Sequence, residues 1–458
     1  MQFKSHSFNA IAAAITVLLT VLHGQAQAQT VEAVPMDSVP PDAQVKADPT
    51  RDFVAKVNQA TGLEFWGYGR GGFYGGGNGA PKGGYALGGD LQKYRLGNEG
   101  DNYLEFGLGK RFDLGNGANF GVYYMPKVYN GTTGTAQAYF TLGGIFGNPS
   151  TLWAGQRYHR IVDVHIVDKF ILEDGDNYGA GIDDIPLGGL GRLNVSAHTS
   201  DSFDNRGGTP NNARRVNAQW RDIPTNPGGA LTITGGLVSG AFAQGKDGGA
   251  AGLMHVQKNF LVAGLNNTAI VQASSGHAAI NGKFYNLDNS TTTTGLLTGV
   301  GFDPNTTFAP LVTRTVTTPQ PGAQQRRILD SLDFQIGRFG GQTLIGYQTT
   351  SPDSGPETKD LSVGGRVSYG IAKYTKLLAE VGVTRRAVDG QARQTLNKGT
   401  LAVAFSPDTD FWTRPEFRLY ATRANWNQAA AVANASSFGA DGRRSATVFG
   451  AQMEVWWK

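Results

Sequence analysis

The sequence predicts an all-β protein, a transmembrane antiparallel β-barrel of 16 to 18 strands. The first observation is that segments of about ten residues alternate apolar and polar side chains between clusters of Gly, Asn, Asp and Pro. The second is a mean hydropathy of -0.27 with no long apolar segment after the first residues, so a membrane crossing needs strands. The third is the content of 65 Gly and no Cys, which leaves stability to a core or to a closed sheet.

The N-terminus, "MQFKSHSFNAIAAAITVLLTVLHGQAQAQT", predicts a cleaved signal peptide over residues 1–28. Lys4 precedes an apolar stretch from Ala10 to Leu22, and the small residues Ala26 and Ala28 follow at the spacing that a signal peptidase requires. A single uncleaved membrane helix is the alternative, although the apolar stretch is short for one. The signal predicts export, and with the barrel it predicts the outer membrane of a Gram-negative bacterium.

Residues 29–62 are polar and rich in Pro, and we expect a periplasmic extension or linker there. At most one short helix is expected in it, near Arg51–Asn58. The barrel domain is then predicted over residues 63–458.

The barrel begins at "LEFWGYGRGGF", where successive side chains change face. One face is apolar, and the other combines rings with charges: Glu64, Trp66, Tyr68 and Arg70. In the next strand, Tyr103 and Glu105 oppose Leu104, Phe106 and Leu108. Residues 342–350, 377–386 and 417–426 repeat the period of two.

The C-terminal "TVFGAQMEVWWK" alternates in the same way. Phe449, Met453 and Trp457 share one face, and Glu454 and Trp456 share the other. We expect Trp457 in the lipid-facing aromatic girdle and Trp456 in the lumen. Simple packing of Trp456 at the strand end is the alternative.

A sheet in a membrane must close into a barrel, because hydrocarbon offers no hydrogen bonds to the backbone groups at the edge of an open sheet. The roughly 395 residues after Leu63 supply 16 to 18 strands at about 22 to 25 residues per strand and connection, a size that leaves an aqueous channel. The polar tracts Thr199–Arg215 and Asn286–Gly322 are expected to be extracellular loops.

Charge and motifs argue against several other functions. The chain has 40 Lys and Arg against 36 Asp and Glu with no basic block, so no nucleic-acid partner is expected. "GYGRGG" satisfies the dinucleotide-binding spacing, but no helix-forming sequence follows it. His159 and His165 lack zinc-type spacing, so the sequence predicts neither an enzyme nor a metal or cofactor site.

The expected lumen residues suit sugars. A pyranose has an apolar face that stacks on rings such as Tyr68 and Tyr103, and a rim of hydroxyls that donate to Glu105 and accept from Arg70. A generic water-filled porin would use the same lumen charges, and composition alone leaves both readings open.

Four motifs resemble those of the maltoporin (LamB-type) family of trimeric, 18-stranded, sugar-selective outer-membrane channels. They are "KYRLGNE" (93–99), "WAGQRYHRIVDVHIVD" (153–168), "GAGIDDI" (179–185) and the terminal "TVFGAQMEVWW". The resemblance extends from Leu63 to Trp457. It implies a homotrimer with a loop folded into each pore as a constriction, an oligosaccharide substrate, contact with outer-membrane lipid, and insertion by the barrel assembly machinery.

The resemblance also implies site residues. The family's aromatic slide corresponds to Tyr68, Tyr103 and Trp456, and its ionic track corresponds to Arg70, Arg95, Glu105, Asp163 and Asp168. Phe170 stands where the family's constriction loop carries a Tyr, which removes a hydroxyl from the narrowest point.

Five features depart from the family pattern. Ile161 replaces a family Arg, with Arg160 one place away, and slide positions align with Ala269 and with Asp360 or Leu361. No counterpart is found for the Trp that a neighbouring subunit contributes, and Lys458 follows the terminal aromatic. The sequence therefore favours a channel for maltose, maltodextrins or related sugars over a sucrose-type or general porin, and over an exported soluble carbohydrate-binding or hydrolytic domain.

Overall fold

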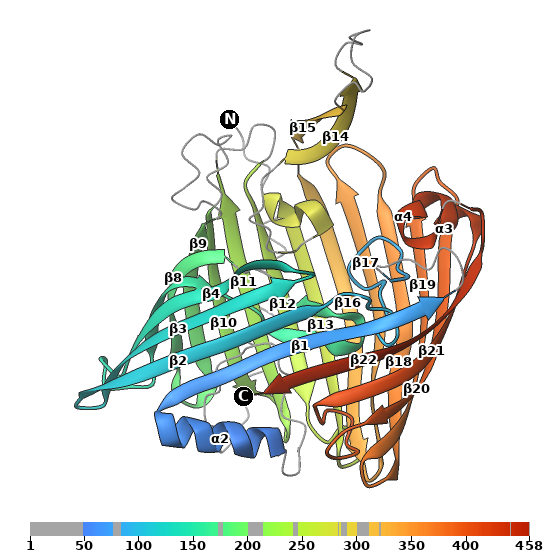
Figure 1. Ribbon diagram of the computed structural model, residues 1–458. Helices are drawn as coiled ribbons and strands as arrows, with labels where there is room; N and C mark the ends of the chain where they lie inside the picture. The colour runs from blue at the N-terminus through green and yellow to red at the C-terminus, as the bar shows by residue number, and fades with distance from the viewer. Residues whose placement is uncertain are drawn as a thin grey trace, which may run out of the picture.

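The computed structural model describes residues 49–76, 84–172, 177–199, 214–240, 246–282, 284, 291–299, 311–319, 322–439 and 441–457. Within these ranges, one antiparallel sheet of 18 strands closes on itself, because β1 (Leu63–Gly76) pairs with both β2 (Tyr103–Gly115) and β22 (Ser445–Trp457) (Figure 1). The predicted all-β barrel and its strand number are confirmed. Residues 1–48, which hold the expected signal peptide, and Lys458 lie outside the described part of the chain.

The remaining barrel strands follow one another around the cylinder, each paired with the next along the chain. They are β3 (Ala118–Tyr129), β4 (Thr132–Gly143), β5 (Thr151–Arg157), β8 (Asn177–Pro186), β9 (Arg192–Thr199), β10 (Arg214–Pro224), β11 (Gly229–Ser239), β12 (Gly248–Gln257), β13 (Leu265–Gly276), β16 (Ala323–Ile336), β17 (Phe339–Pro352), β18 (Thr358–Ala372), β19 (Thr375–Val388), β20 (Gln394–Phe405) and β21 (Glu416–Trp426). Two hairpins lie outside this sheet: β6 (Val162–Val164) with β7 (Lys169–Ile171), and β14 (Thr291–Gly299) with β15 (Leu311–Pro319). The short 3₁₀ turns are η1 (His165–Val167), η2 (Gly188–Leu190) and η3 (His277–Gly282).

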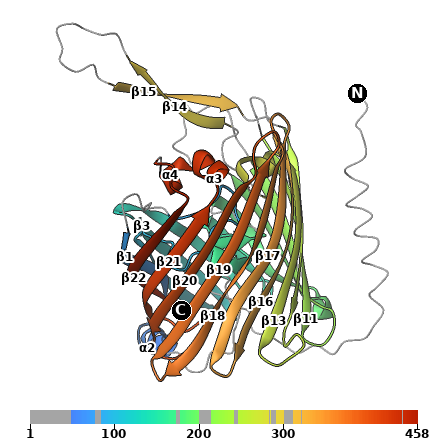
Figure 2. The ribbon, with the colours of Figure 1, turned by 90° about the vertical axis from the view of Figure 1, so that its right-hand side faces the viewer.

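The two ends of the barrel differ. Helix α2 (Pro49–Thr61) and the C-terminus lie at one end, whereas α3 (Gln428–Ala433), α4 (Ala435–Phe438) and β14–β15 lie at the other (Figures 1 and 2). The connections at the α2 end are short, the longest being 406–415. The expected loop over Asn286–Gly322 contains the β14–β15 hairpin, and residues 200–213 of the other expected loop lie outside the described ranges.

The two faces of the strands have inverted polarity relative to a soluble protein. On β19, Val381 is 62% exposed while its charged neighbour Glu380 is 1% exposed, and on β17 Ile345 is 59% exposed beside Leu344 at 0%. Large apolar side chains on the outside and charges inside are expected where the outer solvent is lipid. The period-two segments predicted from sequence lie within β17, β19 and β21, and residues 67–72, the glycine-rich motif, lie in the middle of β1 rather than in a turn before a helix.

The terminal tryptophans occupy the two predicted faces. The Trp457 ring lies 5.7 Å from Phe65 and 6.2 Å from Phe106, both on the outer face, whereas Trp456 is 7% exposed and packs inside near Tyr68. Among the described residues, no helix combines the length and apolarity needed to cross a membrane.

The segment 84–102, between β1 and β2, packs inside the barrel against β18–β22. The Tyr94 ring sits over Gly364 and Gly382, which pair across β18 and β19, and a Cβ at either glycine would overlap it. The Leu96 carbonyl accepts hydrogen bonds from Lys398 at 2.7 Å and Thr400 at 2.9 Å. Sequence analysis did not predict this arrangement.

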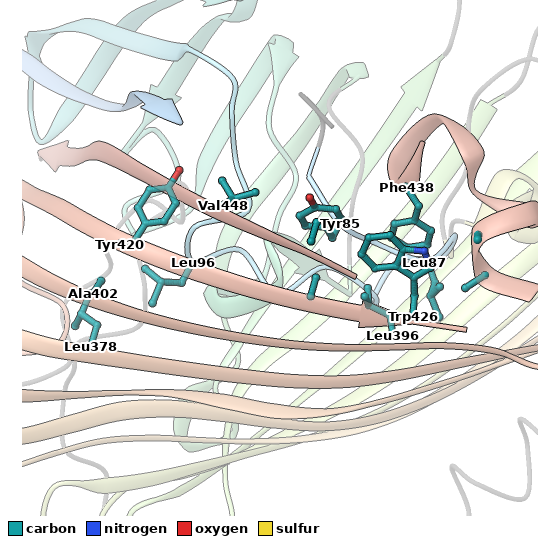
Figure 3. Packing of buried hydrophobic residues seen from close by; sticks show 14 of the residues in the cluster. Tyr85, Leu87, Leu96, Leu378, Leu396, Ala402, Tyr420, Trp426, Phe438 and Val448 are labelled. Carbon is teal, nitrogen blue, oxygen red and sulfur yellow. The ribbon is translucent and has the colours of Figure 1, made fainter. Parts of the chain in front are cut away.

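An apolar cluster anchors the same segment near α3 and α4 (Figure 3). The Tyr85 ring stacks 5.4 Å from Trp426, and Trp426 stacks 4.6 Å from Phe438. Segment 84–102 is therefore packed against the interior of the barrel by residues distant from it in sequence.

The segment 158–172, between β5 and β8, also packs on inward side chains. Its apolar residues, including Ile166 and Ile171, join Ile270 of β13 and Leu344 of β17 in one buried cluster. The backbone N–H of Ile166 donates to Gln342 at 3.1 Å. The position of this segment is therefore determined by contacts with β13 and β17, which are distant in sequence from the two strands that it connects.

Helix α2 confirms the short helix expected near 51–58 and extends beyond it at both ends. It ends at Thr61, and the next residue, Gly62, has a φ of +63° that suits a glycine and donates its N–H to the Asn58 carbonyl at 2.7 Å. Val54 is 1% exposed, so one face of the helix is buried.

Candidate functional site

One pocket brings together all nine residues that the sequence singled out. It encloses about 190 Å³ between β1, β2, β3, β22 and the segments 84–102 and 158–172. Its lining is Tyr68, Arg70, Arg95, Tyr103, Glu105, Tyr129, Arg160, Asp163, His165, Asp168, Phe170 and Trp456. Tyr129, Arg160 and His165 were not selected from sequence, although the alternation of β3 could have placed Tyr129 inside.

Four aromatic residues line the pocket from four adjacent strands. Tyr129 pairs with Tyr103 in the β2–β3 register, and Tyr68 pairs with Trp456 in the β1–β22 register. Ring centroids lie 6.1 Å apart for Tyr129 and Tyr103 and 6.0 Å apart for Tyr103 and Tyr68. The period of two aims each ring inward, and the closed register makes the row continuous.

Asp168 is the main acceptor on the 158–172 side. It follows η1 with a left-handed φ of 56° and accepts hydrogen bonds from Arg70 at 3.2 Å and Lys93 at 3.0 Å, with Arg95 3.8 Å away. Burial opposes its ionisation, but the nearby cations Arg95, Lys93 and Arg70 outweigh it and hold the pKa of Asp168 well below its usual range. The carboxylate is therefore charged at neutral pH.

Arg95 and Tyr68 are held by two carboxylates that the sequence analysis did not list as site residues. Arg95 forms ion pairs with Glu99 at 3.0 Å and Glu454 at 2.9 Å, and it donates to the Tyr68 hydroxyl at 2.5 Å. The Tyr68 hydroxyl in turn donates to Glu454 at 3.0 Å. Glu454 could have been found, because the C-terminal alternation places it inside two residues before Trp456.

Glu105 is enclosed by phenol groups. The hydroxyls of Tyr103 and Tyr158 both donate to its carboxylate, which is 2% exposed. Both bonds end on Oε1, so this oxygen holds the two phenols, and among the described residues no hydrogen bond occupies Oε2.

Arg160, rather than a residue at position 161, reaches the pocket. Its guanidinium lies 3.5 Å from the centre of the Tyr158 ring and 4.3 Å from that of Phe170. Ile161 is 9% exposed and belongs to the apolar cluster under the segment. The charge missing at position 161 is thus present one residue earlier.

Asp163 and His165 are titratable groups of the 158–172 segment that line the pocket. Burial raises the pKa of Asp163 to about 7, an effect that the Arg95 charge opposes. Burial also lowers the pKa of His165 well below its usual value, so the imidazole is neutral although Asp163 lies 3.8 Å away. Because His165 is uncharged, it offers Asp163 no ion pair.

The structure shows which way the side chains point at two of the positions that depart from the family pattern. Ala269 lies on the outer face of β13, between the inward side chains Thr268 and Ile270, and Leu361 faces outward at 39% exposure. Asp360 is the inward residue of that pair, 3.5 Å from Arg386. In the described part of the chain, no group of three or more His, Asp and Glu side chains could hold a metal ion.

The model of the LamB porin family matches residues 63–457, the whole described barrel. The chain belongs to the LamB porin family. This LamB porin is therefore a channel in the outer membrane of a Gram-negative bacterium, surrounded by lipid. Since short turns of such barrels face the periplasm, its α2 end is the periplasmic end.

The porin is also similar to solved barrels of low identity. OccK10 (OpdN) of Pseudomonas aeruginosa matches at 11% identity and a TM-score of 0.45, covering 86% of this chain and 98% of that one. OmpT, an outer membrane protein of Vibrio cholerae, matches at 11% identity and a TM-score of 0.42, covering 86% and 97%. An anion-selective porin from Comamonas acidovorans matches at 11% identity and a TM-score of 0.41, covering 86% and 99%.

Proposed function

We propose that this LamB porin is a sugar-selective channel that lets maltose, maltodextrins or related oligosaccharides diffuse down their gradient without chemical change. The supporting observation is the pocket in which a row of aromatic rings lies beside Arg70, Arg95 and Asp168. The apolar face of a pyranose would stack on the rings, while its hydroxyls would exchange hydrogen bonds with the charged groups.

Transport limits the affinity of such a site. A channel must bind the sugar strongly enough to recruit it and weakly enough to release it. Millimolar binding, about −4 kcal/mol, meets both needs. A few hydrogen bonds of roughly 1 kcal/mol net each, together with ring contacts, are sufficient.

The segment 158–172 is the proposed constriction. It carries Asp163, Asp168 and Phe170 to the pocket, which Tyr68 and Tyr103 also line. Phe170 presents a ring without a hydroxyl there, which favours stacking over a hydrogen bond. We further propose a homotrimer inserted by the barrel assembly machinery after removal of residues 1–28, with residues 29–62 as the periplasmic extension.

A sucrose-type or general porin is the second candidate, and one observation favours it. The aromatic row becomes less accessible toward Trp456, which is 7% exposed and has the Arg414 guanidinium 4.1 Å from its ring centre. A short accessible row suits a disaccharide better than a long glucan.

Sugar block of ion current in a planar bilayer tests the proposal. Maltose and maltotriose should reduce the current of the wild-type channel in a saturable manner, with sucrose tested in parallel. Tyr103→Ala should raise the sugar concentration that gives half-maximal block roughly tenfold, a loss of about 1.4 kcal/mol in binding free energy, because it removes the central ring. Tyr103→Phe should keep most of the effect, since it keeps the ring.

The matched control is Tyr369→Ala, which removes a ring that is 51% exposed on the outer face of β18. It should leave the block unchanged. A conducting channel whose current no sugar reduces would leave only the general porin.

A further inference from the structure

We propose that Tyr129 is the first sugar-stacking residue of the channel, the entry position of the aromatic row, supplied by the same chain as Tyr103 and Tyr68. This assignment rests on the proposed function, because it names where the sugar first contacts the row. It goes beyond the residues that the family resemblance points to, which do not include Tyr129.

The position of Tyr129 follows from the strand register. It is the last residue of β3, at the extracellular end, and it pairs with Tyr103, the first residue of β2. The centroid distances of 6.1 Å to Tyr103 and then 6.0 Å to Tyr68 make an evenly spaced row descending from the mouth. A sugar ring could therefore move from one aromatic ring to the next and stay in contact with the row.

Exposure separates Tyr129 from the rest of the row. It is 49% exposed, Tyr103 and Tyr68 are partly buried, and Trp456 is 7% exposed. A large ring on the inward face of a strand gains nothing from lipid, and water does not favour its exposure. The exposed ring at the pocket is therefore available to stack on a solute that has an apolar face.

The backbone at Tyr129 is fixed rather than loose. Asn130 and Gly131 form a two-residue hairpin turn with φ values of 48° and 85°, the Asn-Gly pattern that such turns favour. The Asn102 N–H donates to the Asn130 side chain at 2.9 Å, and the Asn130 N–H donates to the Asn102 carbonyl at 2.9 Å. The turn is thereby tied to the start of β2, which sets the ring beside Tyr103 before any sugar arrives.

The chemistry of this first contact selects a class of ligand. Tyr129 offers a flat ring. At the next position of the row, the Arg70 guanidinium lies 5.7 Å from the centre of the Tyr103 ring. Arg70 is in turn paired with Asp101 at 2.7 Å. A neutral pyranoside suits this sequence of contacts, because it stacks first and finds donors and acceptors one step deeper.

The experiment measures the kinetics of sugar block from current noise with maltotriose added to one side of the bilayer at a time. Tyr129→Ala should lower the association rate constant roughly three- to tenfold for sugar added from the extracellular side, and less from the other side. Tyr129→Phe should behave as wild type, because the ring remains. Tyr124→Ala is the control: Tyr124 is also 49% exposed and lies on the same strand, but on the lipid face.

The outcomes are distinct. If neither maltotriose nor any other sugar blocks the wild-type channel, the proposed function is wrong and this inference is wrong with it. If it blocks the wild type and Tyr129→Ala with the same association rate, only the entry role is overturned. A Tyr129→Phe variant as slow as Tyr129→Ala would also overturn it, since stacking does not need the hydroxyl.

Discussion

The wall formed by β18–β22 and the wall formed by β1–β3 both carry charged residues, but they use them differently. On the first wall, Glu380 pairs with Arg366 at 2.7 Å and with Lys398 at 2.9 Å, and all three side chains are at most 3% exposed. The segment 84–102 covers them, and Glu380 accepts a hydrogen bond from the Leu96 N–H at 2.9 Å. These charges hold an internal segment in place.

The wall at β1–β3 faces the pocket. There the side chain of Arg70 on β1 is 10% exposed, and that of its partner Asp168, on segment 158–172, is 29% exposed, so a solute in the pocket can compete for this pair. The comparison shows that residue type does not separate ion pairs that hold the structure from those that a solute can reach. What separates them is whether a second segment lies over them.

Glu380→Gln, on the covered wall, should have the largest effect on the stability of the barrel. Arg366 and Lys398 would keep their positive charges in a buried site without the carboxylate, which typically costs about 3 to 5 kcal/mol. The temperature at which the barrel loses its compact, faster-migrating form on an unboiled gel should fall sharply. The sugar concentration for half-maximal block should change less in Glu380→Gln than in Tyr103→Ala. A larger change in Glu380→Gln would show that the covered ion pairs also take part in sugar binding.

Asp163 gives a pH-dependent comparison on the pocket side. Its pKa of about 7 lies above the ordinary value of 3.8, so the carboxyl is neutral below pH 7 and charged above it. The folded state therefore binds this proton more tightly than the unfolded chain, and the resulting stability, full below the ordinary pKa, is lost as pH rises to about 7.

The same titration should change ion selectivity. Between pH 6 and pH 8 the pocket gains one negative charge, so the reversal potential in a KCl gradient should shift toward cation preference. Asp163→Asn should remove that part of the shift and should gain stability relative to wild type above pH 7. An identical pH dependence in the two channels would show that Asp163 does not titrate in this range.

Much of the barrel was predictable because its physical signal is local. Alternation along β1 and β22 placed Tyr68, Glu454 and Trp456 inside and Phe65 and Trp457 outside, and the structure confirms each. The interior was not predictable in this way. The positions of segments 84–102 and 158–172 depend on contacts such as Tyr94 on Gly364 and Gly382, between residues more than 250 positions apart, and no local pattern encodes them.

The pocket shows the same division. Strand residues such as Arg70 and Tyr103 could be assigned from alternation, whereas Arg95, Asp163, Asp168 and Phe170 came only from the family resemblance. At positions that depart from the family pattern, an offset of one residue decides which side chain enters the pocket. Ala269 lies on the outer face, and Arg160 enters the pocket in place of position 161, because in a strand or tight segment a shift of one reverses the side chain's direction.

Glu64→Gln should have the smallest effect and sharpens the comparison. Glu64 pairs with Arg111 at 3.2 Å near the periplasmic end, but their side chains are 35% and 52% exposed, so water screens the pair. Exposed pairs of this kind contribute about 0 to 1 kcal/mol. Arg111 also keeps the Tyr123 hydroxyl as a partner at 3.4 Å. The gel-shift temperature of Glu64→Gln should therefore match wild type, although the chemical change is the same as in Glu380→Gln. Equal destabilisation by the two variants would mean that the number of charges in the lumen, rather than their cover by segment 84–102, determines the stability of this barrel.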